Sequence, residues 1–356
     1  MPEGYTHVRI ARRAAKGVHY HIQYPAAFAA GANGPDSLFC FEIWKSAAKR
    51  RYDLPGLGNR MHDVNTGAFL RSLVTRVSTR PQIEYVLGFL SHYAADTVMH
   101  PYVYAMCQPG MSYGGPGGHG YFEIALDSTL HAEDTGVSLV PAEDTSPLMK
   151  GEELADVTSL LAHCLSDAYG VDIPIEYLAD AFNDIYRLRK LFPSRTGIKK
   201  AFFTLVEPLF GGRGFITGHV SPRRLVPELP DVWNDPFTGE ERKGNAFALL
   251  REAEKRSGIF MAGALEYWMG RITADDLFGL LGSMSYNQGR PTPLSDPSLA
   301  AQQAAEETAR PDAPETSEPA PEAPAPAAEN PPQSDGEDSG PAAQPAEESA
   351  NWTAQA

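Results

Sequence analysis

The chain has 356 residues and a formal net charge of −15, concentrated at one end, because residues 297–356 carry twelve acidic side chains and one basic one. The preceding residues are close to neutral and show no basic stripe, so we do not favour nucleic acid as a partner. No apolar run reaches the about 18 residues of a membrane-spanning helix, and the three cysteines lack the CxxC spacing of disulfide frameworks and cysteine zinc sites.

The N-terminal segment predicts a helix. No basic region followed by an apolar region precedes it, as a secretory signal would require, so we expect a protein of the cytoplasm. Thr6 is a suitable N-cap for a helix that contains Val8, Ile10 and Ala14. A second helix is predicted over residues 66–78, where apolar side chains recur at helical spacing.

A longer helix follows in the sequence. Pro81 suits the first turn of a helix, and we expect Pro101 to end that helix directly after His100. The glycine-rich residues 114–118 then form a loop before a helix over residues 119–131.

The rest of the folded part is also predicted to be helical, and alternation typical of strands is nearly absent. Residues 211–244, rich in proline and glycine, are predicted to be an irregular loop. We therefore expect an all-α fold, a helical bundle forming one domain over residues 1–292, with residues 101–118 and 208–244 folded over it. The later helices are predicted at residues 152–169, 175–191, 197–207 and 245–269, with a short one from residue 273.

The C-terminal residues 293–356 have a different composition. They are rich in Ala, Pro, Glu, Gln and Ser, and no Leu, Ile, Val or Phe follows Leu299. Such a segment cannot bury enough apolar surface to offset the entropy of ordering it. We predict a disordered acidic tail over residues 293–356.

A polar stripe interrupts the apolar helix that begins near Pro81. His92, Asp96 and His100 are spaced four residues apart, so they lie on nearly the same face of a helix. Burying two imidazoles and a carboxylate costs free energy unless something pairs with them. A metal ion is the simplest partner for this stripe.

A second pair of metal-capable side chains begins the next predicted helix. His119 and Glu123 are again four residues apart, and Asp127 continues their stripe. Asp127 is equally compatible with an acceptor that orients a ligand histidine and with a surface carboxylate.

Three further candidate ligands precede the stripe. His7 lies in the first turn of the first helix, and His62 is expected at the start of its own helix. Asp36 follows Gly34-Pro35, a turn that fixes the direction of the carboxylate. Nitrogen and carboxylate ligands of this kind suit zinc best, although other first-row metals also use them.

Together these motifs resemble the zinc-dependent phospholipase C family, which includes the bacterial phosphatidylcholine-hydrolysing enzyme and the catalytic domain of clostridial alpha-toxin. The family fold is an all-helical bundle with a three-zinc cluster, also seen in single-strand-specific zinc nucleases. The resemblance covers roughly residues 5–130 and rests on the order His7, Gly34-Pro35-Asp36, His62, His92-xxx-Asp96-xxx-His100-Pro101-Tyr102 and His119-xxx-Glu123.

The resemblance implies the ligand sets. Two sets would each hold one zinc ion: His62, His92 and Asp96 form the first, and His100, His119 and Glu123 form the second. A third zinc ion would use His7 and Asp36, and Asp36 would also lie near the attacking water. In the secreted enzymes the N-terminal amine and carbonyl complete this third site, whereas here six residues precede His7. We therefore expect two zinc ions, with a third dependent on that N-terminus.

The resemblance also implies a function, the hydrolysis of phosphoester bonds by a metal-activated water, as in a phospholipase C-like phosphodiesterase. The expected substrate is a small phosphoester or a phospholipid head group. The alternative is a binding or structural protein in which zinc only stabilises the fold. Structural zinc sites are closed and catalytic sites keep an open position, and eight ligands over three metals leave positions open. A nuclease is less favoured, because no basic groove is evident.

Overall fold

The computed structural model describes residues 4–209, 212–226 and 229–292, so the predicted tail at 293–356 lies outside the described residues. The all-α prediction is confirmed. The described residues form thirteen α-helices, three short 3-10 helices and one two-stranded antiparallel sheet. Among these residues, no helix combines the length and hydropathy that crossing a membrane requires.

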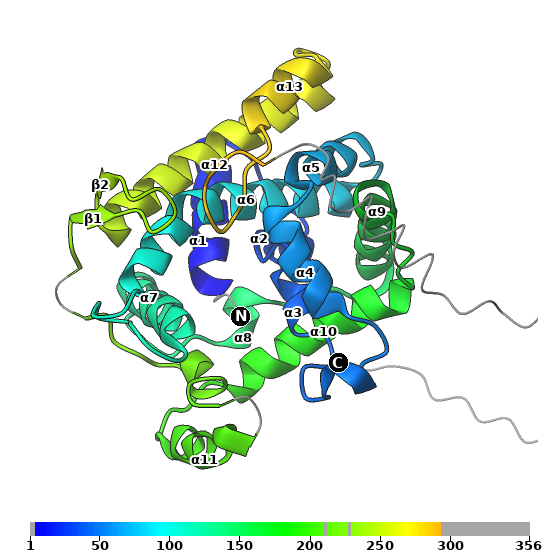
Figure 1. The fold of residues 1–356 in the computed structure, drawn as a ribbon. Coiled ribbons are helices and arrows are strands. Elements are labelled where there is room, and N and C mark those ends of the chain that lie inside the picture. Colours follow the sequence, from blue (N-terminus) through cyan, green and yellow to red (C-terminus); the bar gives the residue numbers. More distant parts are fainter. Residues whose placement is uncertain (1–3, 210–211, 227–228, 293–356) are drawn as a thin grey trace, which may run out of the picture. The chain divides into compact units, whose positions relative to one another are not determined.

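The helix α6 (Arg80–Met106) runs through the middle of the other helices (Figure 1). Its N-terminus is a capping box, in which the Thr79 hydroxyl accepts from the Gln82 N–H and the Gln82 side chain accepts from the Thr79 N–H. At 27 residues it spans about 40 Å. It is buried on nearly all sides, so polar side chains on it face other helices and not solvent.

Three helices pack along α6: α1 (Gly4–Gly17), α2 (Pro25–Ala32) and α12 (Ala246–Trp268). The backbones of α2 and α6 almost touch, because a Cβ atom at Gly88 would lie 2.2 Å from the carbonyl oxygen of Phe28. This close crossing places the residues that follow α2 directly beside α6.

The other elements surround this central group. The sheet pairs β1 (Val232–Asn234) with β2 (Glu241–Lys243) within the predicted irregular loop, with Trp233 opposite Arg242. The remaining helices are α3 (Asp36–Phe39), α4 (Leu54–Asp63), α5 (Thr66–Thr75), α7 (Gly118–Thr135), α8 (Ala142–Thr145), α9 (Gly151–Tyr169), α10 (Ile175–Leu191), α11 (Ile198–Val206) and α13 (Ala274–Leu281), with 3-10 turns η1 (Ala47–Lys49), η2 (Glu207–Leu209) and η3 (Thr217–His219).

The prediction that Pro101 ends its helix is wrong. Pro101 lies inside α6, which continues for five further residues. A proline inside a helix costs about 3 kcal/mol. The side chains of Tyr102, Val103 and Met106 are buried in the core, and their burial offsets this cost.

Two other positions differ from the sequence prediction. His62 lies in the last turn of α4 and not at the start of a helix. Asp36 follows its turn as expected, but it is also the first residue of the short helix α3. The helix α2 was not predicted, because it is apolar and buried all round and so shows no amphipathic period.

Candidate metal centre

The structure brings all eight predicted ligands into one cluster, although they come from five helices. The helix α6 supplies three of them, α7 supplies two, and α1, α3 and α4 supply one each. Seven are buried, and His119 is partly exposed. The eight residues are His7, Asp36, His62, His92, Asp96, His100, His119 and Glu123.

The first group contains His62, His92 and Asp96. Each offers a ligand atom, and these atoms lie within 4.8 Å of one another. The Nε2 atom of His92 is 3.0 Å from Oδ2 of Asp96, and that of His62 is 3.8 Å from the same oxygen. These are the three residues for which the sequence resemblance implies one zinc ion.

The second group contains His100, His119 and Glu123. Their ligand atoms also lie within 4.8 Å of one another. Oε1 of Glu123 is 3.5 Å from Nε2 of His100 and 2.9 Å from Nε2 of His119. The proline within α6 follows His100 directly without disturbing its place on the helix.

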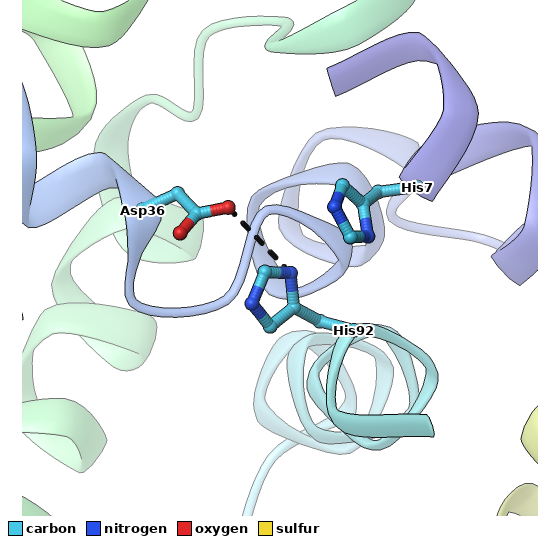
Figure 2. A group of neighbouring side chains, drawn as sticks. All are labelled: His7, Asp36 and His92. Carbon is cyan, nitrogen blue, oxygen red and sulfur yellow. Dashed lines mark ion pairs between the residues drawn. The ribbon is translucent and has the colours of Figure 1, made fainter. Parts of the chain in front are cut away.

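The third group contains His7 and Asp36, as predicted, together with His92 (Figure 2). The three side chains come from α1, α3 and α6 and point toward one another. Oδ2 of Asp36 is 3.7 Å from Nδ1 of His92, and the rings of His7 and His92 have centroids 4.6 Å apart. His92 therefore belongs to two of the three groups.

Asp96 joins the groups to one another. Its Oδ1 atom is 3.3 Å from Nε2 of His7 and 3.7 Å from Nε2 of His100, while Oδ2 faces His62 and His92. One carboxylate thus contacts four imidazoles. The arrangement is one continuous cluster and not three separate sites.

Backbone carbonyls orient three of the histidines. A carbonyl has no proton, so the imidazole Nδ1 must donate, and a neutral ring then presents the lone pair of Nε2 to the cluster. Metal-binding histidines commonly have such a partner on the second nitrogen. Nδ1 of His62 donates to the carbonyl oxygen of Gly58 (2.7 Å), Nδ1 of His92 to that of Ala32 (3.2 Å), and Nδ1 of His100 to that of Tyr286 (3.2 Å).

Five of the six carboxylate oxygens in the cluster accept no hydrogen bond of good geometry, and the sixth, Oε1 of Glu123, pairs with His119. Neither oxygen of Asp36 or of Asp96 accepts a hydrogen bond of good geometry, and the same holds for Oε2 of Glu123. Among the described residues, no lysine or arginine forms an ion pair with any of the three. Buried carboxylates need compensating positive charge. The donor set therefore fits a metal cation.

The pKa values show how strongly the carboxylates act on the histidines. Burial lowers the pKa of His100, but Asp96 and Glu123 outweigh that effect and raise it to about 9. For His7, burial outweighs the attraction of Asp96 and lowers the pKa to about 4. Burial raises the pKa of Asp96 and of Glu123, yet the neighbouring histidines bring both well below the usual range. Asp96 and Glu123 therefore stay ionised at neutral pH.

A small cavity lies between members of the cluster. It has a volume of about 30 Å³ and is bordered by His7, Asp96, His100 and Glu123 among others. About 10–15 Å³ of such volume is enough for one water molecule. The cluster therefore has internal room for an ion or a water but not for a larger molecule.

Asp127 has a different role from the two that the sequence allows. It is buried, and its carboxylate accepts from the backbone N–H groups of Tyr5 (2.9 Å) and Thr6 (2.7 Å) and from the Thr6 hydroxyl. It thus caps the first turn of α1 from α7. Because His7 is the next residue, this contact fixes where His7 enters the cluster.

The segment after α13 also borders the cluster, which the sequence did not predict. Tyr286 is buried beside His62, with ring centroids 5.4 Å apart, and its N–H donates to the carbonyl of His62 at 2.7 Å. Asn287 donates to Asp63 at 2.7 Å. This segment carries no metal-capable residue and no amphipathic period, so no sequence signal points to it.

The exposed edge of the cluster is at His119, whose side chain is 33% exposed. The Tyr104 ring lies 5.1 Å from that of His119 and 5.3 Å from that of Phe237. The Tyr104 hydroxyl donates to Asn287 at 3.1 Å. Tyr104 therefore borders the most exposed ligand of the cluster, and Phe237 packs against Tyr104.

Five histidines and three carboxylates gathered by helices define a candidate multinuclear metal protein of the all-α class. A family model described as "Zinc dependent phospholipase C" matches residues 6–184, just over half of the chain, and the chain belongs to this family. The matched range contains all eight residues of the cluster. No match was found among curated proteins or among solved structures.

Proposed function

We propose that the protein is a zinc-dependent hydrolase of phosphoester bonds, a phospholipase C-like phosphodiesterase. The observation that carries this proposal is a set of carbonyl-oriented histidines beside three buried carboxylates, of which five of the six oxygens accept no hydrogen bond of good geometry. Membership of the zinc-dependent phospholipase C family supports the same activity.

The ligands follow the three groups of the cluster. Bound zinc supplies a Lewis acid that favours the attack of water on a phosphoester. We propose two zinc ions, with His7 and Asp36 as the ligands of a third. The proposed sets are His62, His92 and Asp96; His100, His119 and Glu123; and His7 and Asp36, which lie beside His92.

Asp36 is the proposed proton acceptor. Both of its oxygens are buried without a hydrogen bond of good geometry, and Oδ1 is 3.2 Å from Nε2 of His62. A carboxylate held in this way can accept the proton of an attacking water. The short helix α3 holds it in place, because Asp36 is the first residue of that helix.

The proposed substrate is a small phosphoester or a phospholipid head group. It would approach at His119, where the ring of Tyr104, itself packed against Phe237, borders the cluster. Nucleic acid is not proposed as a substrate. Location in the cytoplasm stays a prediction.

The test combines metal analysis with an activity panel. Purified protein should contain two to three zinc ions per chain and should release product from phosphodiesters, and a chelator should abolish that release. Asp96→Asn should reduce zinc content and activity together, because Asp96 contacts four of the histidines. The matched control is Asp180→Asn, at an exposed carboxylate that pairs with Arg51. It should change neither zinc content nor activity.

A second candidate function has its own observation. The cavity inside the cluster is only about 30 Å³, and seven of the eight ligands are buried, which suits zinc that only stabilises a binding or structural protein. This alternative would be supported if the zinc-loaded protein is inactive on every phosphodiester of the panel and loses stability when a chelator removes the zinc. One zinc ion or none would contradict both.

A further inference from the structure

A row of exposed apolar side chains runs along α11 and the turn η2 that follows it. The first three are spaced at i, i+4 and i+7, so they lie on one face of α11, and the fourth follows in η2. No residue of α11 is buried. Exposed apolar patches of this kind mark interaction sites. The exposed fractions are 72% for Ile198, 59% for Phe202, 78% for Leu205 and 82% for Leu209.

The opposite side of this segment is held by the protein. The ring of Phe203 packs on that of Phe192, with centroids 6.4 Å apart. Glu207 is buried, and its carboxylate accepts from the N–H groups of Gly214 (3.0 Å) and Thr217 (2.8 Å). The apolar row therefore points away from the residues that anchor the segment.

The charge of this region is opposite to that of the chain. Residues 187–224 contain nine basic side chains and one acidic one, the buried Glu207, whereas the whole chain carries −15. Among the described residues, none of the exposed cations around α11 forms an ion pair with a carboxylate. These cations are Lys190, Arg195, Lys199, Lys200 and Arg213.

We propose that this surface binds the protein to an anionic lipid bilayer. We define the α11 surface as the apolar row with these five cations. An exposed apolar row on a helix whose other faces and flanking segments carry unpaired cations is the pattern of a helix that lies in a membrane interface, with apolar side chains among the acyl chains and cations on the head-group phosphates. At physiological salt the screening length is about 8 Å, so acidic side chains farther away than this act only weakly on these cations.

Two other partners fit the α11 surface less well. A nucleic acid would engage the cations but would leave Ile198, Leu205 and Leu209 exposed, because it binds through phosphates and through stacking on aromatic rings. A second copy of the chain would bring two positively charged surfaces together.

The α11 surface is joined to the helix that carries part of the metal centre. Gly214 packs against Gly117, the residue that precedes α7, and the hydroxyl groups of Tyr121 and Thr217 lie 2.9 Å apart. Binding to lipid does not depend on catalysis. Presentation of lipid head groups near His119 would follow only if the proposed hydrolysis is correct.

The test is co-sedimentation of the full-length, zinc-loaded protein with vesicles of phosphatidylcholine alone or mixed with phosphatidylserine. We expect sedimentation with the mixed vesicles only, weakened by raising the salt to about 0.5 M. Leu205→Glu should lower partitioning at least about tenfold, because it removes a buried apolar contact and adds repulsion. Ile259→Glu, at a 45% exposed position on α12, is the matched control and should bind like the unchanged protein.

Several results would overturn the proposal: no sedimentation with mixed vesicles, equal partitioning of Leu205→Glu and the unchanged protein, or an equal loss in Ile259→Glu. Two outcomes without vesicle binding would assign the surface to another partner. One is binding of single-stranded DNA, and the other is a dimer that Leu205→Glu dissociates. Head-group release, measured in the same tubes, reports hydrolysis separately. Vesicle binding without release supports the α11 surface and counts against the proposed enzyme.

Discussion

At the scale of single residues, Asp127 shows how one helix can complete another. A helix N-terminus leaves N–H groups without partners and favours negative charge. On α1 that charge comes from α7, through the carboxylate that accepts from Tyr5 and Thr6. The two helices that carry His7 and Glu123 are therefore joined by a charged hydrogen-bonded contact.

Asp127→Asn should destabilise the protein. The amide would present its NH2 group to N–H donors, and a buried donor left without an acceptor costs about 1–3 kcal/mol. Urea denaturation should show a lower free energy of unfolding by that amount. Glu133→Gln, on the same helix and half exposed beside Arg9, should change it by less than about 0.5 kcal/mol. Equal stability of the two variants would exclude the capping role.

At this scale the sequence predicts the identity of candidate ligands better than their orientation. The spacing of His92, Asp96 and His100 is enough to place them on one face of α6. The acceptors that orient the rings are main-chain carbonyls of Ala32, Gly58 and Tyr286. Every residue has a main-chain carbonyl, so the sequence does not show which ones act as acceptors.

At the scale of elements, the crossing of α2 and α6 depends on glycine. A Cβ atom at Gly88 would approach the Phe28 carbonyl oxygen to 2.2 Å and the Ala32 nitrogen to 2.7 Å. The same turn of α2 carries the carbonyl that accepts from His92. Helix packing and ring orientation are thus set by one close contact.

Gly88→Ala should separate these two helices. The gain in helix propensity is about 1 kcal/mol, and the clash with the backbone of α2 costs more, so we expect a net loss of about 1–3 kcal/mol. The melting temperature and the zinc content should both fall. Gly279→Ala on α13, where a Cβ atom meets nothing within 4 Å, should instead stabilise the protein slightly. A stable, zinc-replete Gly88→Ala would contradict the close crossing.

Helices were predictable where apolar periodicity and a cap coincide. The last two show this, since Asn245 caps α12 and Thr273 caps α13, close to the predicted boundaries. Prediction failed where burial is uniform, as in α2, and where tertiary packing overrides a local signal, as at Pro101. Neither effect is visible in a single segment, because both depend on which surfaces meet.

At the scale of the whole molecule, three buried carboxylates make the folded state depend on added positive charge. Removing zinc should therefore lower the melting temperature. A ligand at about a thousand times its dissociation constant contributes about 4 kcal/mol, which corresponds to roughly 10 °C in a domain of this size.

Calorimetry with and without a chelator measures this shift. Adding zinc back should restore the melting temperature, and magnesium should not, because Mg²⁺ prefers oxygen ligands and retains its waters. An unchanged melting temperature after complete zinc removal would show that the cluster is stable without a metal.

The contact between His100 and Tyr286 joins residues 186 positions apart in the chain. During synthesis on a ribosome, the three ligands of α6 emerge long before the carbonyl that orients the last of them. Five helices and the segment after α13 must all be present before every imidazole has its partner. Orientation of the His100 ring is therefore a late event, and a nascent chain that ends before Tyr286 would hold the ligands of α6 without the carbonyl that orients the last of them.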